Sequence, residues 1–148
     1  MSTRSYICKV EKDGTLTGVY CHNDGYLEGV GAVLFKHYKT RKRVNALIAL
    51  GNLSSVHPKL APTKGVAHSF DNPAKGVTVA YVRDRGEKGQ EPQKVTLENL
   101  TSSDSWIDYV YVFGLDGRWR YLRTFDYWKN KKTPFVLYDL GEALDKLS

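Results

Sequence analysis

The sequence has no apolar run approaching the roughly 20 residues that a membrane-spanning helix needs. Met1 to Ser5 is not followed by the apolar block of a signal peptide, so we expect a cytosolic protein with no membrane partner. The two cysteines, Cys8 and Cys21, are too few for a disulfide framework and favour free thiols in a reducing compartment. Cys-x-x-Cys spacing is absent and the four histidines are scattered, so the sequence predicts no metal site.

Internal repeats and low-complexity segments are also absent, and 148 residues are enough for a single domain (1–148) with its own core. Hydrophobic residues at 41% and charged residues at 26% are typical of a folded globule. Lys and Arg number 22 against 16 Asp and Glu, which gives a net charge of +6. This excess favours an acidic partner, either a nucleic acid or an acidic protein, without choosing between them.

Strand signals dominate the sequence. Residues Ser5–Val10 and 16–20 are rich in β-prone side chains and flank an Asp-Gly turn, which predicts a hairpin. A second hairpin is predicted from 106–113 and 118–125, again around Asp-Gly, with apolar side chains on both faces. We therefore expect one face to meet the core and the other to meet a helix, a loop or a partner. Shorter strands are expected at 77–83 and 135–138, and a long proline-containing loop at 52–73.

Helical signals are fewer and shorter. Apolar residues between 30 and 38 recur with a helical period, and Thr40 is typical of an N-cap for a second helix at 41–50. The spacing of Asp139 and Glu142 predicts a capping box that opens a terminal helix. The expected fold is therefore α+β: a mainly antiparallel sheet of hairpins with two or three short helices packed on it.

The stretch from 20 to 31 combines polar side chains with glycines, and we interpret it as a corner between a strand and a helix. Free N–H groups at the start of that helix would attract an anion. The alternative is that the glycines only permit a turn and close packing. The stretch is neither a phosphate-binding loop nor a dinucleotide fingerprint, so we expect no cofactor. Candidate ligand-binding residues are Arg4, Tyr20, His22, Asp24, Tyr26, Gly29 and Gly31.

No catalytic residue can be named from the sequence. Cys21 and His22 are adjacent on a predicted strand and point to opposite faces, so they do not form a nucleophile–base pair. The same alternation directs Cys21 toward the core. No pair of Asp or Glu residues is singled out for acid–base chemistry either.

Basic residues gather in two stretches, the second of which is interleaved with aromatics. Such a surface would grip a nucleic acid or an acidic partner through phosphate contacts and stacking. The alternative is that the rings belong to the core and the lysines form a solvated edge. The candidates are Lys36, Lys39, Arg41, Lys42, Arg43, Arg118, Arg120, Trp128, Lys129, Lys131 and Lys132.

Several segments resemble a family of small bacteriophage and prophage proteins to which no activity is assigned. They are Ser-Thr-Arg-Ser-Tyr-Ile at 2–7, Tyr-Cys-His-Asn-Asp-Gly-Tyr at 20–26, Gly-Val-Gly at 29–31, His-Tyr at 37–38, Leu-Ile-Ala-Leu-Gly at 47–51 and Tyr-Val-Tyr-Val-Phe at 109–113. Asn23 and Leu27 depart from the Trp and Pro of that family, so the detailed shape of the corner does not carry over. The resemblance implies a viral accessory protein acting in the cytoplasm of a host bacterium.

We therefore expect a non-enzymatic phage protein that binds and interferes with a host protein or a host defence system. The partner would be that host protein or the nucleotide signal that the system uses. One alternative is a basic accessory protein that binds single-stranded nucleic acid. A second alternative is a small enzyme acting on a nucleotide at the corner.

Overall fold

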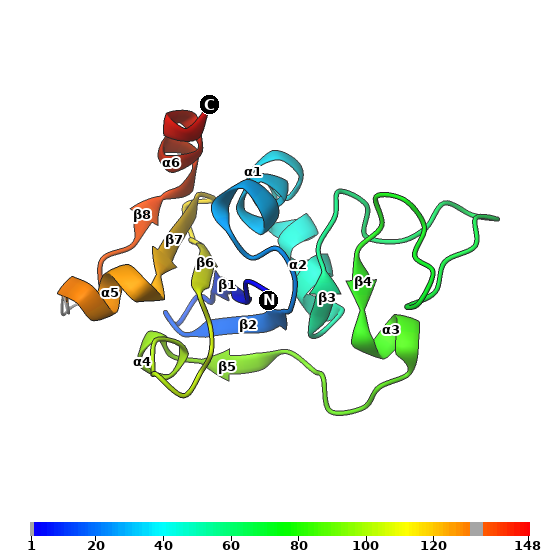
Figure 1. The fold of residues 1–148 in the computed structure, drawn as a ribbon, viewed down its shortest axis with the longest axis horizontal. Helices are drawn as coiled ribbons and strands as arrows, with labels where there is room; N and C mark the ends of the chain where they lie inside the picture. The colour runs from blue at the N-terminus through cyan, green and yellow to red at the C-terminus, as the bar shows by residue number, and fades with distance from the viewer. Residues whose placement is uncertain (1, 131–134) are drawn as a thin grey trace.

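A computed structural model describes residues 2–130 and 135–148. It contains one eight-stranded sheet in the order β4-β3-β2-β1-β6-β7-β8, with β5 paired to β2 beside this path (Figure 1). The β1–β6 and β2–β3 pairs are parallel and the other pairs are antiparallel, which confirms the expected α+β class. The strands are β1 (Ser5–Val10), β2 (Leu16–Cys21), β3 (Leu53–Ser55), β4 (Val79–Ala80), β5 (Gln93–Val95), β6 (Tyr109–Phe113), β7 (Trp119–Arg123) and β8 (Tyr138–Asp139).

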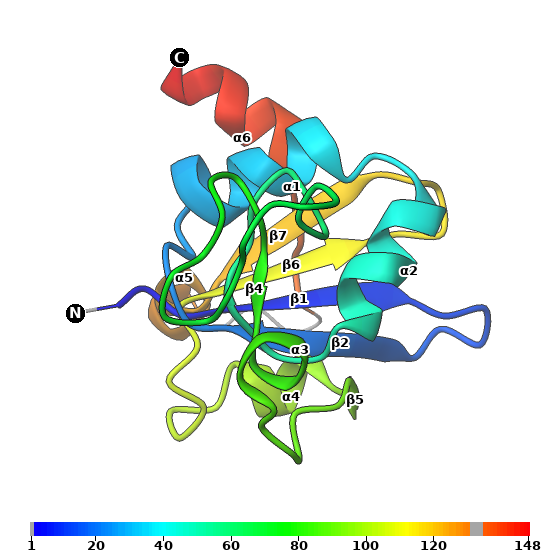
Figure 2. The ribbon, with the colours of Figure 1, turned by 90° about the vertical axis from the view of Figure 1, so that its right-hand side faces the viewer.

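Helices cover both faces of the sheet, and they are more numerous than the two or three expected. Figure 2 shows α1 and α6 above the central strands and α4 below them. No helix in residues 2–130 and 135–148 has the length and apolar character needed to cross a bilayer. The helices are the π-helical turn η1 (Leu27–Gly31), α1 (Ala32–His37), α2 (Arg41–Ala49), α3 (Tyr81–Arg85), α4 (Leu97–Leu100), α5 (Thr124–Asn130) and α6 (Leu140–Leu147).

Two hydrophobic clusters, one on each face, hold the sheet between its helices. On the first face, Ile7 and Tyr111 pack with Leu34 of α1 and Leu140 of α6, and all four are fully buried. Burial of each such side chain contributes roughly 1.5–3 kcal/mol. The second face packs β1, β6 and β7 residues against α4 and against Tyr127 of α5, and its buried members include Cys8, Leu100, Val110, Val112 and Leu122.

Local capping and turn chemistry explains the elements that the sequence predicted well. The side chain of Thr40 accepts a hydrogen bond from the Arg43 N–H at the start of α2, and Asp139 caps α6 in the same way. Gly14 and Gly117 adopt φ +88° and +78° in the two hairpin turns, where a residue with a Cβ would be strained. These short-range signals do not depend on the rest of the fold.

The strand predicted at 77–83 is wrong beyond Ala80. After β4 the chain enters α3, where the carboxylate of Asp84 accepts the Ala80 N–H at 2.9 Å. The predicted hairpin strands at 106–113 and 118–125 are also shorter than expected. Helix α5 begins at Thr124, whose hydroxyl donates to the Ile107 carbonyl at 2.6 Å. The predicted loop at 52–73 contains β3 at its start.

Candidate functional site

The corner between β2 and η1 is fixed by buried backbone contacts. Asp24 adopts a left-handed conformation with φ +57°, which turns the chain sharply. The Gly25 N–H donates to the Thr3 carbonyl at 2.9 Å, and the buried hydroxyl of Tyr111 donates to the Gly25 carbonyl at 2.6 Å. The corner is therefore tied both to the N-terminal segment and to the middle of β6.

The glycines of the corner serve close packing, which is one of the two interpretations left open by the sequence. A Cβ on Gly29 would overlap the Asp24 carbonyl, and a Cβ on Gly31 would lie 3.2 Å from the Tyr111 ring. The N–H groups of Gly29 and Val30 donate to the carbonyls of Tyr26 and Asp24 at 3.0 and 2.8 Å. These donors are already used, so they are not offered to an anion.

Three of the predicted ligand-binding residues lie together at the end of the sheet where β1 begins. The strand registers place Arg4 between His22, which follows β2, and Asp108, which precedes β6. The Arg4 N–H donates to the Asp108 carboxylate at 2.9 Å, and its Nε is buried without a hydrogen-bond partner. The Tyr20 hydroxyl lies 2.7 Å from Nδ1 of His22.

Burial makes the reactive groups near the corner poor nucleophiles. It raises the pKa of Tyr20, and the opposing effect of Arg4 does not cancel this rise. Burial also raises the pKa of Cys21 to about 12 and raises the pKa of Cys8, so both thiols stay protonated near pH 7. Cys21 faces the core as expected, in a different cluster from Cys8. The two thiols lie on opposite faces of the sheet and therefore cannot form a disulfide.

Trp106 is the most exposed large hydrophobic side chain of the described residues, at 72%. Its φ of +61° is rare for a bulky residue, with a typical cost of about 1–3 kcal/mol. The turn is held by Ser105, whose hydroxyl donates to the Leu100 carbonyl at 2.7 Å and accepts the Ile107 N–H at 3.2 Å. The backbone is thus constrained on both sides of a tryptophan that is left in solvent.

Other exposed rings lie at the same end of the sheet. Phe125 is 56% exposed and Tyr26 is 41% exposed. The guanidinium carbon of Arg123 lies 5.4 Å from the Phe125 ring and 6.0 Å from the Tyr109 ring. The pairing of β1 with β6 and of β6 with β7 places these side chains at the same end of the sheet. We call this surface the aromatic end and define it by Arg4, His22, Tyr26, Trp106, Arg123 and Phe125.

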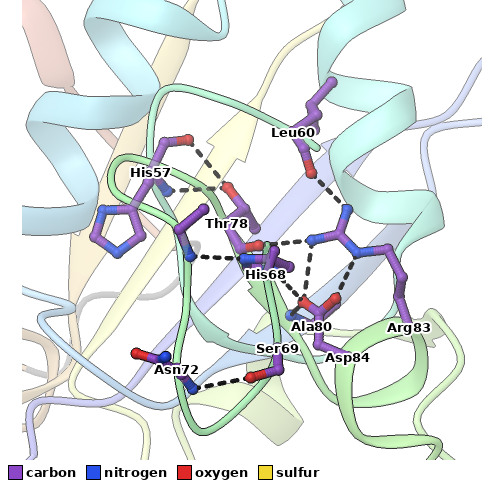
Figure 3. A network of polar contacts seen from close by, with 10 residues as sticks. His57, Leu60, His68, Ser69, Asn72, Thr78, Ala80, Arg83 and Asp84 are labelled. Carbon is purple, nitrogen blue, oxygen red and sulfur yellow. Dashed lines mark hydrogen bonds and ion pairs between the residues drawn. The ribbon is translucent and has the colours of Figure 1, made fainter. Parts of the chain in front are cut away.

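A buried polar network that the sequence did not reveal lies between the long loop and α3 (Figure 3). Nε2 of His68 lies 3.1 Å from the Asp84 carboxylate, and both side chains are at most 5% exposed. Nδ1 of His68 accepts the Ala74 N–H at 3.0 Å. Arg83 donates to the same carboxylate at 2.8 and 3.0 Å. Nδ1 of His68 is hydrogen-bonded and Nε2 is buried against the Asp84 carboxylate, so the cluster ties the loop to α3.

A second part of this network joins the loop to α1. The Tyr38 hydroxyl donates to the His57 carbonyl at 2.6 Å, and the Thr78 hydroxyl donates to the same carbonyl at 3.0 Å. The imidazole of His57 points away from these bonds (Figure 3). Burial lowers the pKa of His57, while the nearby Asp24 acts in the opposite direction. The loop at 52–73 is thereby tied to the end of α1 and to the segment before β4.

Three of the predicted partner-binding cations are engaged by the protein itself. Arg41 donates to the Val10 carbonyl at 2.9 Å, and Arg43 donates to the carbonyls of His37 and Pro58 at 2.8 Å. Arg120 pairs with the Asp116 carboxylate at 2.7 Å. Lys36, Lys39, Lys42 and Arg118 are exposed.

The predicted basic and aromatic surface is divided between the two ends of the sheet. Arg118 precedes β7, whereas Trp128 and Lys129 lie in α5 beyond the other end of that strand. The indole N–H of Trp128 donates to the Thr101 carbonyl at 2.6 Å, so this ring anchors α5. Lys131 and Lys132 lie outside the described residues.

Comparison of the chain with protein-family models, curated proteins and solved structures gives no match. Within residues 2–130 and 135–148, no three His, Cys, Asp or Glu side chains gather as metal ligands would.

Proposed function

We propose that the protein is a bacteriophage accessory factor that binds a protein of its bacterial host through the aromatic end. The phage and host parts of this proposal are supported by the resemblance of the segments around 2–7 and 20–31. The binding surface is supported by Trp106, whose strained backbone holds a 72% exposed indole in solvent. Strain of this kind is characteristic of sites where function opposes stability.

The composition of the aromatic end favours a folded protein over a nucleic acid. Trp, Tyr and Arg are the residues most enriched at the energetic centres of protein interfaces. Nearby carboxylates outnumber the two arginines, Arg4 and Arg123, and a polyanion would be repelled by them. These carboxylates belong to Asp24, Glu28, Asp108 and Asp126.

The protein would act by occupancy, covering a surface of a host enzyme or defence protein. Arg4 is partly exposed at this end of the sheet and supplies a guanidinium to the surface. A carboxylate of the host protein would pair with its terminal nitrogens, since arginine binds carboxylates strongly. The Tyr20–His22 hydrogen bond beside it would hold the rim of the surface in one conformation.

A capture experiment tests this proposal. Tagged wild-type protein is incubated with bacterial lysate, and bound proteins and small molecules are identified by mass spectrometry. Trp106→Ala and Phe125→Ala are expected to lower recovery of a stoichiometric host protein at least tenfold, because aromatic anchors contribute about 2 kcal/mol or more. Leu147→Ala is the matched control, because Leu147 is 53% exposed at the end of α6 and belongs to neither proposed surface.

Equal recovery with all three variants would contradict the proposal. Recovery of a nucleotide with no host protein would favour the alternative of a nucleotide-capturing or nucleotide-acting protein. A thermal-shift panel of nucleotides on wild type and His22→Ala separates these outcomes, because the aromatic-end proposal expects no shift in either.

A further inference from the structure

The end of the sheet opposite the aromatic end contains a groove of about 590 Å³ lined mostly by polar side chains. It lies where the β1–β2 hairpin turn, the start of α2 and the β6–β7 turn meet, at the right of Figure 2. Four cations line it, drawn from three separate parts of the chain: Lys9, Lys12, Arg41 and Lys94. Only Lys9 and Lys12 are close in sequence, so composition alone does not reveal the cluster.

The register of the strands sets the distance between two of these cations, Lys9 and Lys94. Lys9 pairs with Thr17, and Thr17 pairs with Lys94, so the two lysines stand on one face two strands apart. Their Cα atoms are therefore roughly 10 Å apart, twice the spacing of neighbouring strands. The Lys9 ammonium donates to the Asn45 side chain at 2.9 Å, and Arg41 is held by the Val10 carbonyl and by the Phe113 ring at 5.6 Å.

The two carboxylates in the groove accept hydrogen bonds within the β1–β2 hairpin. Glu11 accepts the Thr17 hydroxyl at 2.9 Å. Asp13 accepts the N–H and the hydroxyl of Thr15 at 3.0 and 2.7 Å, and these bonds lower its pKa. Four cations against two carboxylates leave the groove positive, and Lys42 lies on the same α2 helix as Arg41.

We propose that this basic groove binds the phosphodiester backbone of a nucleic acid without reading its bases. Leu115 is the one apolar residue among the described residues that line the groove, so it has no ring on which a base would stack. The described lining also lacks the Trp and Tyr side chains that are enriched at the energetic centres of protein interfaces. Lysines and an arginine spaced across strands suit phosphate contacts, which fix position and carry no sequence information. This second binding activity is separate from the proposed host-protein surface.

Fluorescence anisotropy with a labelled 20-nucleotide single strand and a 20-base-pair duplex tests the proposal across a salt series. The test variant carries Lys9→Gln, Lys12→Gln and Lys94→Gln. The matched control carries Lys64→Gln, Lys75→Gln and Lys88→Gln, which remove the same charge from exposed positions elsewhere. Loss of three phosphate contacts is expected to reduce the slope of log K against log salt by about 2–3, with little change in the control.

Several outcomes would overturn the proposal. They are absence of binding at about 50 mM salt, equal losses in both triple variants, and polyglutamate binding as tightly as the oligonucleotide, which would assign the groove to an acidic protein. Chemical denaturation checks that the triple variant is folded, and Lys12→Gln alone provides a second variant at an exposed hairpin tip. Trp106→Ala is expected to leave nucleic-acid binding unchanged, so the two proposed activities can fail independently.

Discussion

The two ends of the central strands differ in how their side chains are held. At the aromatic end, Trp106 is exposed on a backbone with φ +61° and its ring has no partner in the described chain. At the basic groove, Lys9 and Arg41 are held by hydrogen bonds to Asn45 and to the Val10 carbonyl, with no strained backbone. The first arrangement leaves an apolar ring in solvent, where a partner can bury it, whereas the second presents charges that act over a distance.

This contrast gives each end its own experimental signature. Binding at the aromatic end is expected to depend on shape and on buried apolar area, and therefore to change little with salt. Binding at the basic groove is expected to weaken steeply with salt, because bound counterions are released. Both kinds of binding require a stably folded protein, so the largest predicted effect is on the free energy of unfolding.

Asp84→Ala is expected to lower the free energy of unfolding by about 3 kcal/mol, because Arg83 and His68 would lose their buried carboxylate. Urea denaturation measures the change. Asp116→Ala is the control: its pair with Arg120 is exposed, and such pairs contribute less than about 1 kcal/mol. Similar losses in both variants would show that the network of Figure 3 does not stabilise the loop.

Acid is expected to weaken the same network. Burial opposes ionisation of Asp84, but hydrogen bonds from Arg83, the Ala80 N–H and His68 outweigh it and lower its pKa to about 2. Because this pKa lies below the unfolded value of about 3.9, the stabilisation is complete above about pH 5 and is lost as the pH falls toward 2.

Allowing for solvent screening, the contribution of Asp84 is about 1–2 kcal/mol. Unfolding free energies of wild type and Asp84→Asn, measured between pH 2 and pH 6, are expected to converge at the acid end. A constant difference over this range would contradict the assignment.

Tyr111→Phe is expected to destabilise the end of the sheet that contains the corner and to leave the opposite end unchanged. It leaves the buried Gly25 carbonyl without its donor, at an expected cost of about 1–3 kcal/mol. Hydrogen exchange is expected to accelerate in η1 and not in the β1–β2 hairpin turn. Uniform acceleration across the sheet would mean that the corner is not an independent unit.

Trp106→Gly has the smallest predicted effect and the opposite sign. Glycine adopts a positive φ without strain, so the variant is expected to be more stable by about 0.5–1 kcal/mol while losing partner binding. Thermal denaturation and the capture assay measure the two quantities. A destabilised Trp106→Gly would show that the indole supports the fold and is not held for a partner.

The sequence predicted elements whose determinants are local. Each of these determinants lies within four residues of sequence, and the structure confirms the N-caps at Thr40 and Asp139 and the two Asp-Gly turns. The alternation of residues 77–83 predicts a strand, but the chain turns into α3 at Tyr81, and the Asp84 carboxylate accepts the Ala80 N–H and contacts His68. The contact with His68 comes from the long loop, and propensity does not reveal a tertiary contact.

The candidate sites depended on contacts between distant segments, so less of them could be predicted. Arg4, Tyr20 and His22 lie together because β1 and β2 are neighbours in sequence as well as in the sheet. The sequence predicts Trp106 on a regular strand, whereas the structure holds it in a turn through the bonds of Ser105 to the Leu100 carbonyl and to the Ile107 N–H. The basic groove contains residues of β1, α2 and β5, and no local sequence pattern indicates that these elements lie close together.

The most direct test of the two-ended account is photo-crosslinking in bacterial lysate. p-Benzoylphenylalanine is placed at position 106 in one variant and at position 12 in another, and the adducts are digested with nuclease and analysed by mass spectrometry. The account predicts a host protein crosslinked from position 106 and nuclease-sensitive adducts from position 12. The same protein crosslinked from position 12 and nothing from position 106 would contradict it.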